Sequence, residues 1–267
     1  AYDVARRSND STLQTIICET MEKYLGYWFS SKKRDFSTGL ITAVFEETFS
    51  NPHQDPGIIA PVDLNVAVAI GCLNTSKLAK YLGKKEEAEK YFLDYRQLSA
   101  NINQYLWNDD DQVYYNYNIP EKKQDKRLLC TTFDPLQQGI ASPDRIEKLI
   151  PALLNPSLFY WGIRPLTTIS RTEPGYMEAT GPYDGRAWFG DIWTLRNLPV
   201  INGLEDAGKH DLAAELTWAT IKTFNARYCE YITPANGSGE GVQRYGWTAS
   251  QYIQAIVENL FGIDYDA

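Results

Sequence analysis

Apolar residues recur at spacings of three and four along most of the chain, and this period restricts the fold more than any other feature. It is clearest in the segments 12–30, 63–82 and 85–107. Such spacing gives each helix one apolar stripe that must be buried against another element. Further helices are expected at 143–152, 191–206, 210–229 and 247–261. Glycines expected to cap helix C-termini are Gly83, Gly208 and Gly262. The sequence therefore predicts a mainly helical fold built from antiparallel helix pairs.

Long segments without helical period separate these helices, at 31–61, 108–141 and 153–187. Within them, short strands are expected at Val113–Tyr117 and Arg164–Ser170. Loops of this length in a compact domain usually carry function. The chain shows no glycine-rich phosphate loop, no alternation of strands and helices, and no internal sequence repeat. We therefore expect the functional residues to lie in the loops of a helical fold.

Charge and composition exclude several classes of protein. The formal net charge is -8 and the pI is near 4.9, which argues against a nucleic-acid partner because such a partner requires a basic face. No run of 18 or more apolar residues occurs, so no membrane span is expected. The cysteines and histidines lack metal-ligand spacing, and neither a metal nor a cofactor is expected. Asn-x-Ser sequons at Asn9, Asn74 and Asn236 slightly favour the secretory pathway over the cytoplasm, and the location is otherwise undetermined.

One carboxylate, Glu240, lies within the glycine-rich segment GSGEGVQRYGWTAS at 237–250. Glycines let the backbone adopt conformations closed to other residues, and an acid on such a loop is a stronger functional candidate than one on a helix face. The following Tyr-Gly-Trp-Thr run offers flat aromatic faces on which a sugar ring can stack. The alternative is a solvated acid in an ordinary surface turn.

Glycoside hydrolysis needs two carboxyl groups, one that protonates the leaving oxygen and one that acts on water or on the sugar. The adjacent pair Glu46 and Glu47 lies well apart in sequence from Glu240. A like-charged neighbour raises the pKa of a carboxylic acid, as a general acid requires. The segment GPYDGRAWFGDIW at 181–193 adds an arginine and two tryptophans suited to binding a sugar.

Four motifs in the same order resemble the trehalase and glycoside hydrolase family 63 group, which includes processing α-glucosidases and mannosylglycerate hydrolase-like enzymes. PVDLN at 61–65 is similar to the run that opens a barrel helix in trehalases. YLWNDDDQVYYNYN at 105–118 is similar to the family's acidic turn and aromatic strand. RAWFGDIW at 186–193 resembles the family's Trp-Arg-Gly-Pro-Ile-Trp segment, and GEGVQRYGWTAS at 239–250 its acid-bearing loop. The resemblance covers roughly residues 35–262.

This resemblance implies an (α/α)6 toroid and an inverting mechanism. Residues 1–267 would form a single helical domain, the C-terminal portion of a barrel that is incomplete in this chain. The family's base corresponds to Glu240, which would activate water. The family's acid lies shortly before PVDLN, where this chain has Glu46 and Glu47 and no aspartate. Either Glu47 or Glu46 takes the role, or the acid is lost and the protein only binds sugar.

Sugar binding is assigned, on the same basis, to a further set of residues: Arg186, Trp188, Asp191, Gln243, Trp247 and Asp63. Each has a structural alternative. Asp63 is favoured as the N-cap of a helix that begins at Leu64, and Asp191 is the corresponding candidate for the helix Ile192–Leu204. Arg186 is alternatively a partner of Asp184, and the tryptophans, Trp193 included, are alternatively core residues.

The favoured function is therefore a glycosidase acting on an α-linked glucoside or mannoside. The other classes considered are a catalytically inactive carbohydrate-binding toroid and a helical interaction protein. The sequence leaves open the glycone, the aglycone and the linkage. An incomplete ring would leave apolar faces uncovered, so a second chain, or the missing N-terminal part of a precursor, is expected to pack against 12–30 and 247–261. The start at Ala1 without a methionine is compatible with cleavage from a precursor. The competing expectation is a shortened domain whose helix 12–30 folds across the gap.

Overall fold

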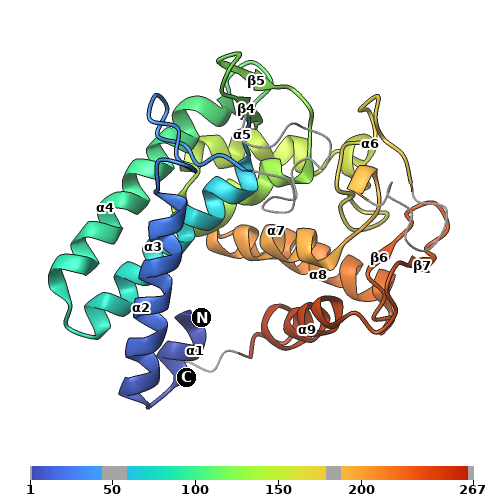
Figure 1. Ribbon diagram of the computed structural model, residues 1–267. Coiled ribbons are helices and arrows are strands. Elements are labelled where there is room, and N and C mark those ends of the chain that lie inside the picture. The colour runs from blue at the N-terminus through green and yellow to red at the C-terminus, as the bar shows by residue number, and fades with distance from the viewer. Residues whose placement is uncertain (1, 44–58, 179–187, 264–267) are drawn as a thin grey trace. The chain divides into compact units, whose positions relative to one another are not determined.

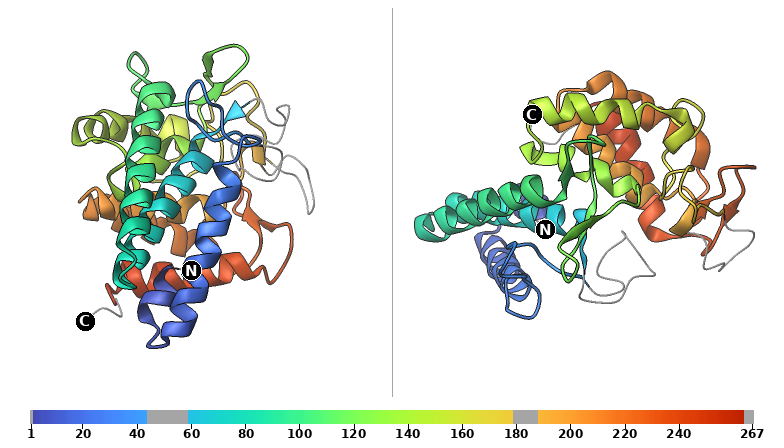
Figure 2. Two further views of the ribbon diagram at one scale, coloured as in Figure 1. Left: turned by 60° about the vertical axis from the view of Figure 1, so that its left-hand side comes forward. Right: turned by 90° about the horizontal axis from the view of Figure 1, so that it is seen from above.

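The computed structural model describes residues 2–43, 59–178 and 188–263. These residues form two compact units (Figures 1 and 2). The first comprises the described residues up to 107 together with 116–125. The second comprises residues 108–115 and the described residues from 126 onward. Each unit is described by itself below.

The first unit is a stack of helices. Its helical elements are α1 (Tyr2–Arg7), α2 (Ser11–Trp28), α3 (Val62–Tyr81), α4 (Lys85–Asn101) and η1 (Ile102–Leu106). In Figure 1, α3 lies between α2 and α4 and packs against both. Their shared core contains Cys18 from α2, Leu78 and Ala79 from α3, and Ala88 from α4. The apolar stripes of the sequence therefore face one another, as the helical period predicts.

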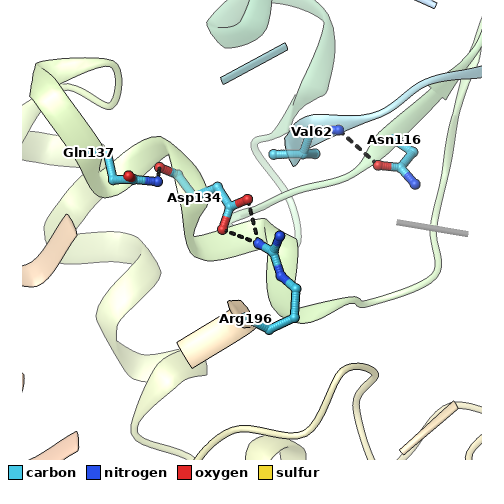
Figure 3. A network of polar contacts seen from close by, with 5 residues as sticks. All are labelled: Val62, Asn116, Asp134, Gln137 and Arg196. Atoms are coloured by element: carbon cyan, nitrogen blue, oxygen red, sulfur yellow. Dashed lines mark hydrogen bonds and ion pairs between the residues drawn. The ribbon is translucent and has the colours of Figure 1, made fainter. Parts of the chain in front are cut away.

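A small antiparallel sheet fixes the start of α3. Its strands are β1 (Ile59–Ala60), β4 (Asn116–Asn118) and β5 (Lys123–Asp125), in the order β1-β4-β5. Pro61 is the N-cap of α3 and makes no side-chain capping bond. Instead, the amide of Val62 donates to Oδ1 of the buried Asn116, at 3.0 Å (Figure 3). A side chain from the sheet thus satisfies an amide that the helix itself leaves without a partner.

The second unit is built around α7 (Thr194–Asp206). Its other helical elements are η2 (Cys130–Gly139), α5 (Pro143–Leu153), α6 (Pro156–Phe159), α8 (His210–Phe224), α9 (Gly246–Gln254) and η4 (Ala255–Leu260). Helix α7 packs against η2, α8 and α9. Ile221, Phe224, Ile232 and Tyr252 belong to one buried apolar cluster of this unit. A further short strand pair is formed by β2 (Trp107–Asn108) and β3 (Val113–Tyr114).

A ladder of short backbone pairings runs through the second unit. Leu129 pairs with Ile169, Thr167 with Ile192, and Ile192 with Ile232, all antiparallel. Ile192 and Ile232 exchange two hydrogen bonds of 2.9 Å each. The predicted strand at 164–170 is therefore present only as single-residue pairings. It nevertheless joins segments that are far apart in the sequence.

The predicted helices are confirmed within a few residues of their ends, with the following differences. The segment 210–229 stops at Phe224, because Asn225 adopts a left-handed conformation with φ of 47°. The segment 85–107 changes from α4 to the wider turns of η1 at Ile102, and 247–261 changes in the same way from α9 to η4 at Ala255. The segment 130–139 lies in a stretch without helical period but forms η2. Gly83, Gly208 and Gly262 all have positive φ after their helices, as predicted. Among the described residues, none of the helices has the length and apolar character needed to cross a bilayer.

Candidate functional site

Glu240 lies on a short hairpin in the second unit. Strand β6 (Tyr231–Ile232) pairs antiparallel with β7 (Gly239–Glu240), and Glu240 is directly opposite Tyr231. Residues directly opposite each other in an antiparallel pair project to the same face. Tyr231 is 2% exposed whereas Glu240 is half-buried. The side chain of Glu240 therefore lies on the same face of the hairpin as a buried aromatic ring, and the residue is partly exposed to solvent.

Two glycines allow the hairpin to pack this closely. A Cβ added to Gly239 would lie 2.7 Å from Sγ of Cys229. Gly241 has a φ of +71°, and a Cβ there would lie 2.6 Å from both Cε1 of Tyr231 and Oε2 of Glu230. Gly239 is thus required for close packing against Cys229, and Gly241 for close packing against the Tyr231 ring and for its backbone conformation.

A row of three stacked aromatic rings leads to the hairpin. Trp188 stacks on Trp193 with ring centroids 4.1 Å apart and an interplanar angle of 14°. Trp193 stacks in turn on Tyr231 at 5.1 Å and 29°. Trp193 is 3% exposed, whereas Trp188 is half-buried. The row thus has a buried end opposite Glu240 and a partly accessible end at Trp188.

The segment that carries Trp188 is held at two points by one threonine. The buried Thr168 donates its hydroxyl to the carbonyl of Trp188, at 2.9 Å. Its amide donates to the carbonyl of Asp191, at 3.1 Å. Ile192 then joins the backbone ladder to Ile232. These bonds fix the aromatic row relative to the hairpin that bears Glu240.

Asp191 is completely buried, and its expected role as a helix cap is wrong. Helix α7 begins at Thr194 with Trp193 as its N-cap, so Asp191 lies before the capping position. Its side chain is at 0% exposure. Burying a carboxylate costs free energy unless hydrogen bonds or an opposite charge compensate it. Asp191 therefore lies in the fixed interior next to the aromatic row rather than on the helix surface.

Asp63 belongs to the first unit, and here too the capping assignment is wrong. Helix α3 begins at Val62, with Pro61 as the N-cap, so Asp63 is the second residue of the helix. Its exposure is 6%. A carboxylate in the first turn is favoured by the positive end of the helix dipole. Its burial at the start of the helix keeps it a candidate for the sugar-binding role.

The remaining candidates lie on the surface or outside the described residues. Trp247, in the first turn of α9, is 55% exposed and lies beside Tyr245, with ring centroids 5.8 Å apart. Gln243 is exposed, and its side-chain amide donates to the carbonyl of Gly241 at 3.4 Å. The other predicted residues, Glu46, Glu47 and Arg186, lie outside the described residues. The structure therefore gathers Glu240, Trp188, Asp191, Gln243 and Trp247 in the second unit.

Two groups near the hairpin have shifted pKa values. Burial raises the pKa of the Cys229 thiol. Burial also raises the pKa of Tyr245, and the nearby Glu230 carboxylate raises it further. Both groups are therefore neutral at physiological pH. Within the described ranges, no group of three or more His, Cys, Asp and Glu residues is arranged to hold a metal ion. The arrangement around Glu240 is suited to acid–base chemistry by a carboxylate.

Sequence reasoning missed Tyr231 and Glu230. Glu230 accepts the amide of Val242 at 2.9 Å and so holds the strand end just after Glu240. The signal for a hairpin was nevertheless present. A short run of β-formers at Tyr231–Ile232 precedes Pro234 and the turn dipeptide at Asn236–Gly237.

Comparisons with known proteins find relatives among glycoside hydrolases. A mannosylglycerate hydrolase of Rubrobacter radiotolerans is 24% identical over 207 residues, which is 76% of this chain and 45% of that protein. A periplasmic trehalase of Citrobacter koseri is 24% identical over 204 residues, covering 71% of this chain and 33% of that protein. The chain thus spans less than half the length of these curated relatives.

Solved structures show the same architecture. The family 63 mannosylglycerate hydrolase of Thermus thermophilus, in complex with glucose, superposes with a TM-score of 0.64 at 21% sequence identity. The match covers 76% of this chain and 50% of that chain. This similarity shows the mainly helical fold of the (α/α)6 glycosidase toroids, and the partial coverage fits an incomplete toroid.

The family model for the mannosylglycerate hydrolase MGH1-like glycoside hydrolase domain matches residues 8–248. That range includes the PVDLN helix start, the aromatic row and the hairpin with Glu240. The chain therefore belongs to the MGH1-like glycoside hydrolase family.

Proposed function

We propose that this chain carries an inverting glycosidase site for an α-linked glucoside or mannoside, with Glu240 as the general base. The observation that carries the proposal is the position of Glu240, opposite Tyr231 at the end of the Trp188–Trp193–Tyr231 row. A half-buried carboxylate can accept a proton from water, and stacked aromatic rings provide a flat apolar surface for a sugar. The names of the relatives, mannosylglycerate hydrolase and trehalase, support an α-glycoside as substrate.

The general acid of this proposal is Glu47 or, failing that, Glu46. The sequence resemblance supports this assignment, since the pair stands shortly before the PVDLN segment. Substrate binding is proposed for Trp188, Asp191, Gln243 and Trp247, together with Arg186 and Asp63. For Trp188 and Trp247 the support is that both residues are at least partly exposed. For Asp191 it is burial beside the aromatic row.

Replacing Glu240 by Gln tests the base. The amide keeps the shape of the side chain but accepts no proton, so turnover should fall by ~10²–10⁴ with little change in sugar affinity. Glu215→Gln is a matched control, because Glu215 is an exposed glutamate on α8 of the same unit. Hydrolysis is measured against a panel of α-glucosides and α-mannosides. An unchanged rate in the Glu240→Gln variant would remove Glu240 from the mechanism.

The stereochemistry of the first product tests inversion. Proton NMR during the first turnovers should detect the β-anomer released from an α-glycoside. Initial release of the α-anomer would contradict an inverting mechanism. If the unaltered chain binds sugar in calorimetry but hydrolyses none of the panel, the alternative of an inactive carbohydrate-binding toroid replaces the enzyme. A chain that neither binds nor hydrolyses sugar would favour the helical interaction protein.

A partner surface is proposed on each unit separately. Helix α2 exposes Ile16, Tyr24 and Tyr27, and the C-terminal segment exposes Ile253 and Phe261. Contiguous exposed apolar side chains are typical of interaction surfaces, which supports this proposal. We propose that a second chain, or a further part of a longer protein, covers these faces and completes the helical ring of which residues 1–267 form a part. Light scattering that finds a monomer of 30.4 kDa at all concentrations would contradict a second chain.

The proposal for the location of the protein rests on the name of one relative and on the exposed sequons. The relative from Citrobacter koseri is named a periplasmic enzyme, and the sequons at Asn9 and Asn236 are both exposed. We propose a secretory-pathway or periplasmic location. Cell fractionation of the source organism tests it, and recovery in the cytosolic fraction would contradict it.

A further inference from the structure

The turn that joins β6 to β7 is held by contacts from outside the hairpin. Within the turn, the amide of Thr233 donates to the carbonyl of Ser238, and that of Gly237 to the carbonyl of Thr233, each at 2.9 Å. Outside it, Arg227 donates to the carbonyl of Gly237 at 2.7 Å. The hairpin has only two residues in each strand, so it depends on such contacts for a fixed orientation.

The carboxylate of Glu178 makes a further contact with the turn from outside the hairpin. One oxygen accepts the backbone amide of Ala235, in the turn, at 2.9 Å. The other accepts the hydroxyl of Tyr176 at 2.7 Å and that of Tyr160 at 3.3 Å. Hydrogen bonds to an ionised acceptor are about twice as strong as neutral ones. Glu178 therefore ties the hairpin turn to two tyrosines from other segments.

Tyr160 is itself held in place by its surroundings. Tyr160 adopts a left-handed conformation, with φ of 63°, at the end of α6. The guanidinium of Arg171 lies 3.9 Å from the centroid of the Tyr160 ring, and Nη1 of Arg171 donates to the carbonyl of Pro156. A non-glycine residue keeps such a backbone conformation only where its surroundings enforce it. Burial raises the pKa of Tyr176, so its hydroxyl remains a donor at neutral pH.

The same segment contacts the aromatic row. The amide of Met177 donates to the carbonyl of Phe189 at 2.9 Å. Gly190 packs so closely on Met177 that a Cβ there would lie 2.6 Å from its carbonyl oxygen. Residues 176–178 thus touch the segment that carries Trp188 on one side and the hairpin turn on the other. They connect the two parts of the site.

We propose that Glu178 is a positioning residue, which fixes the hairpin turn through Ala235 and thereby orients Glu240 against the aromatic row. Its carboxylate is engaged by three donors, so it acts through the hairpin rather than on a ligand. A catalytic carboxylate misplaced by about 1 Å loses rate on the order of 10²-fold. The catalytic consequence rests on the proposed function, whereas the positioning of the hairpin does not.

Hydrogen exchange tests the positioning without any assay of activity. In Glu178→Ala, amides of the peptide 231–241 should exchange at least about tenfold faster, while those of α8 stay unchanged. Glu178→Gln should show a smaller rise. Its amide oxygen can accept from the tyrosines or from Ala235, and its NH2 group then faces the remaining donors. The double variant Tyr160→Phe/Tyr176→Phe should also raise exchange in the hairpin. Glu215→Gln is the control and should change neither region.

Two results in Glu178→Ala would overturn the proposal. One is unchanged exchange in the hairpin. The other is an equal rise in exchange throughout α8, which indicates general destabilisation. If Glu178→Ala fails to fold, the Gln and double-Phe variants decide by the same criterion.

Kinetics then test the catalytic consequence. On a glycoside that the unaltered chain hydrolyses, Glu178→Ala should lower kcat at least about tenfold with KM nearly constant, and Glu178→Gln should recover part of the loss. A change in KM alone would contradict a role in orienting Glu240. If the unaltered chain hydrolyses nothing, the proposed function fails, and hydrogen exchange still decides whether Glu178 positions the hairpin.

Discussion

Asn65 and Asn197 make the same set of hydrogen bonds in two different helices. Each lies four residues after the N-cap of its helix, and its Nδ2 donates to the N-cap carbonyl, of Pro61 at 2.8 Å and of Trp193 at 2.9 Å. Each also binds both backbone groups of one residue from an earlier segment. Asn65 binds Ile41, at 2.8 and 2.9 Å. Asn197 binds Leu166, at 2.8 and 3.0 Å.

This repeated arrangement lies at the two helix starts that carry the candidate residue Asp63 and the stacked ring of Trp193. Asp63 follows the N-cap Pro61 by two residues, and Trp193 is itself an N-cap. In each unit a fully buried asparagine thus joins the start of a helix to an extended segment beside it. The two helix starts are equivalent in local structure although their sequences, PVDLN and WTLRN, share only the final asparagine in register.

Replacing either asparagine by alanine should destabilise its own unit. The change leaves a buried amide and carbonyl without a partner, so we expect a loss of at least about 2 kcal/mol in each variant. Hydrogen exchange during urea unfolding should show the loss in 59–81 for Asn65→Ala and in 166–206 for Asn197→Ala. Asn202→Ala, at a half-buried position further along α7, is the control. Equal losses at Asn197 and Asn202 would contradict this role.

The buried ion pair between Asp134 and Arg196 gives a second prediction. Nη2 of Arg196 donates to both carboxylate oxygens, at 2.7 and 2.6 Å, and both side chains are 5% exposed (Figure 3). Replacing one partner leaves an uncompensated buried charge and should cost about 3–5 kcal/mol. The double variant Asp134→Leu/Arg196→Met should cost much less than the sum of the single changes. Additive losses in a double-mutant cycle would show that the pair is not coupled.

Gly241 should be intolerant of even a methyl group. In Gly241→Ala, positive φ and the contacts with Tyr231 and Glu230 oppose the new Cβ, so the hairpin must shift. We expect altered tryptophan fluorescence, from the disturbed row, and at least about tenfold lower turnover. Gly246→Ala is the matched control, since no atom lies within 4 Å of a Cβ built there and its backbone is helical. A fluorescence spectrum unchanged in Gly241→Ala would indicate that the row is independent of the hairpin.

The proposed acids can be separated by the leaving group. An activated aryl leaving group needs less protonation than a natural sugar or glycerate. The variant lacking the true acid, Glu46→Gln or Glu47→Gln, should therefore lose ~10²–10⁴-fold on natural glycosides and much less on aryl glycosides. The other variant serves as its control. If neither loses activity on a natural glycoside, the acid comes from another part of the protein.

Much of the helical architecture could be predicted from the sequence, because the spacing of apolar residues reports directly on buried faces. The stripe of 63–82 became α3, with Leu78 and Ala79 in the core of the first unit. Helix starts were harder. Asp63 and Asp191 are good capping residues by type, but Pro61 and Trp193 occupy the N-cap positions. At the start of α3 the amide of Val62 is bonded instead by Asn116, which is distant in sequence and invisible to local patterns.

The candidate site was predicted in part for the same reason. Glu240 stood out because of its glycines and the turn around it. Tyr231 did not, although it lies directly opposite Glu240. The stacking of Trp188 on Trp193 also joins two residues close in sequence, but the contact of Trp193 with Tyr231 depends on the pairing of Ile192 with Ile232. Only the tertiary structure brings these residues together.

The single-residue pairings of the ladder have a consequence for folding. Each pairing joins two residues that are far apart along the chain, as at Leu129, Thr167 and Ile192. Forming such a pairing closes a long loop, and the closed loop gains only a few hydrogen bonds in return. Contacts of this kind form slowly, whereas helices and the β6–β7 hairpin depend on local contacts. We expect the hairpin that carries Tyr231 and Glu240 to reach Trp193 and Trp188 late, after α7 and α8 have docked. On heating, the aromatic row should separate before the helices melt, so near-ultraviolet circular dichroism should fade at a lower temperature than the helical signal.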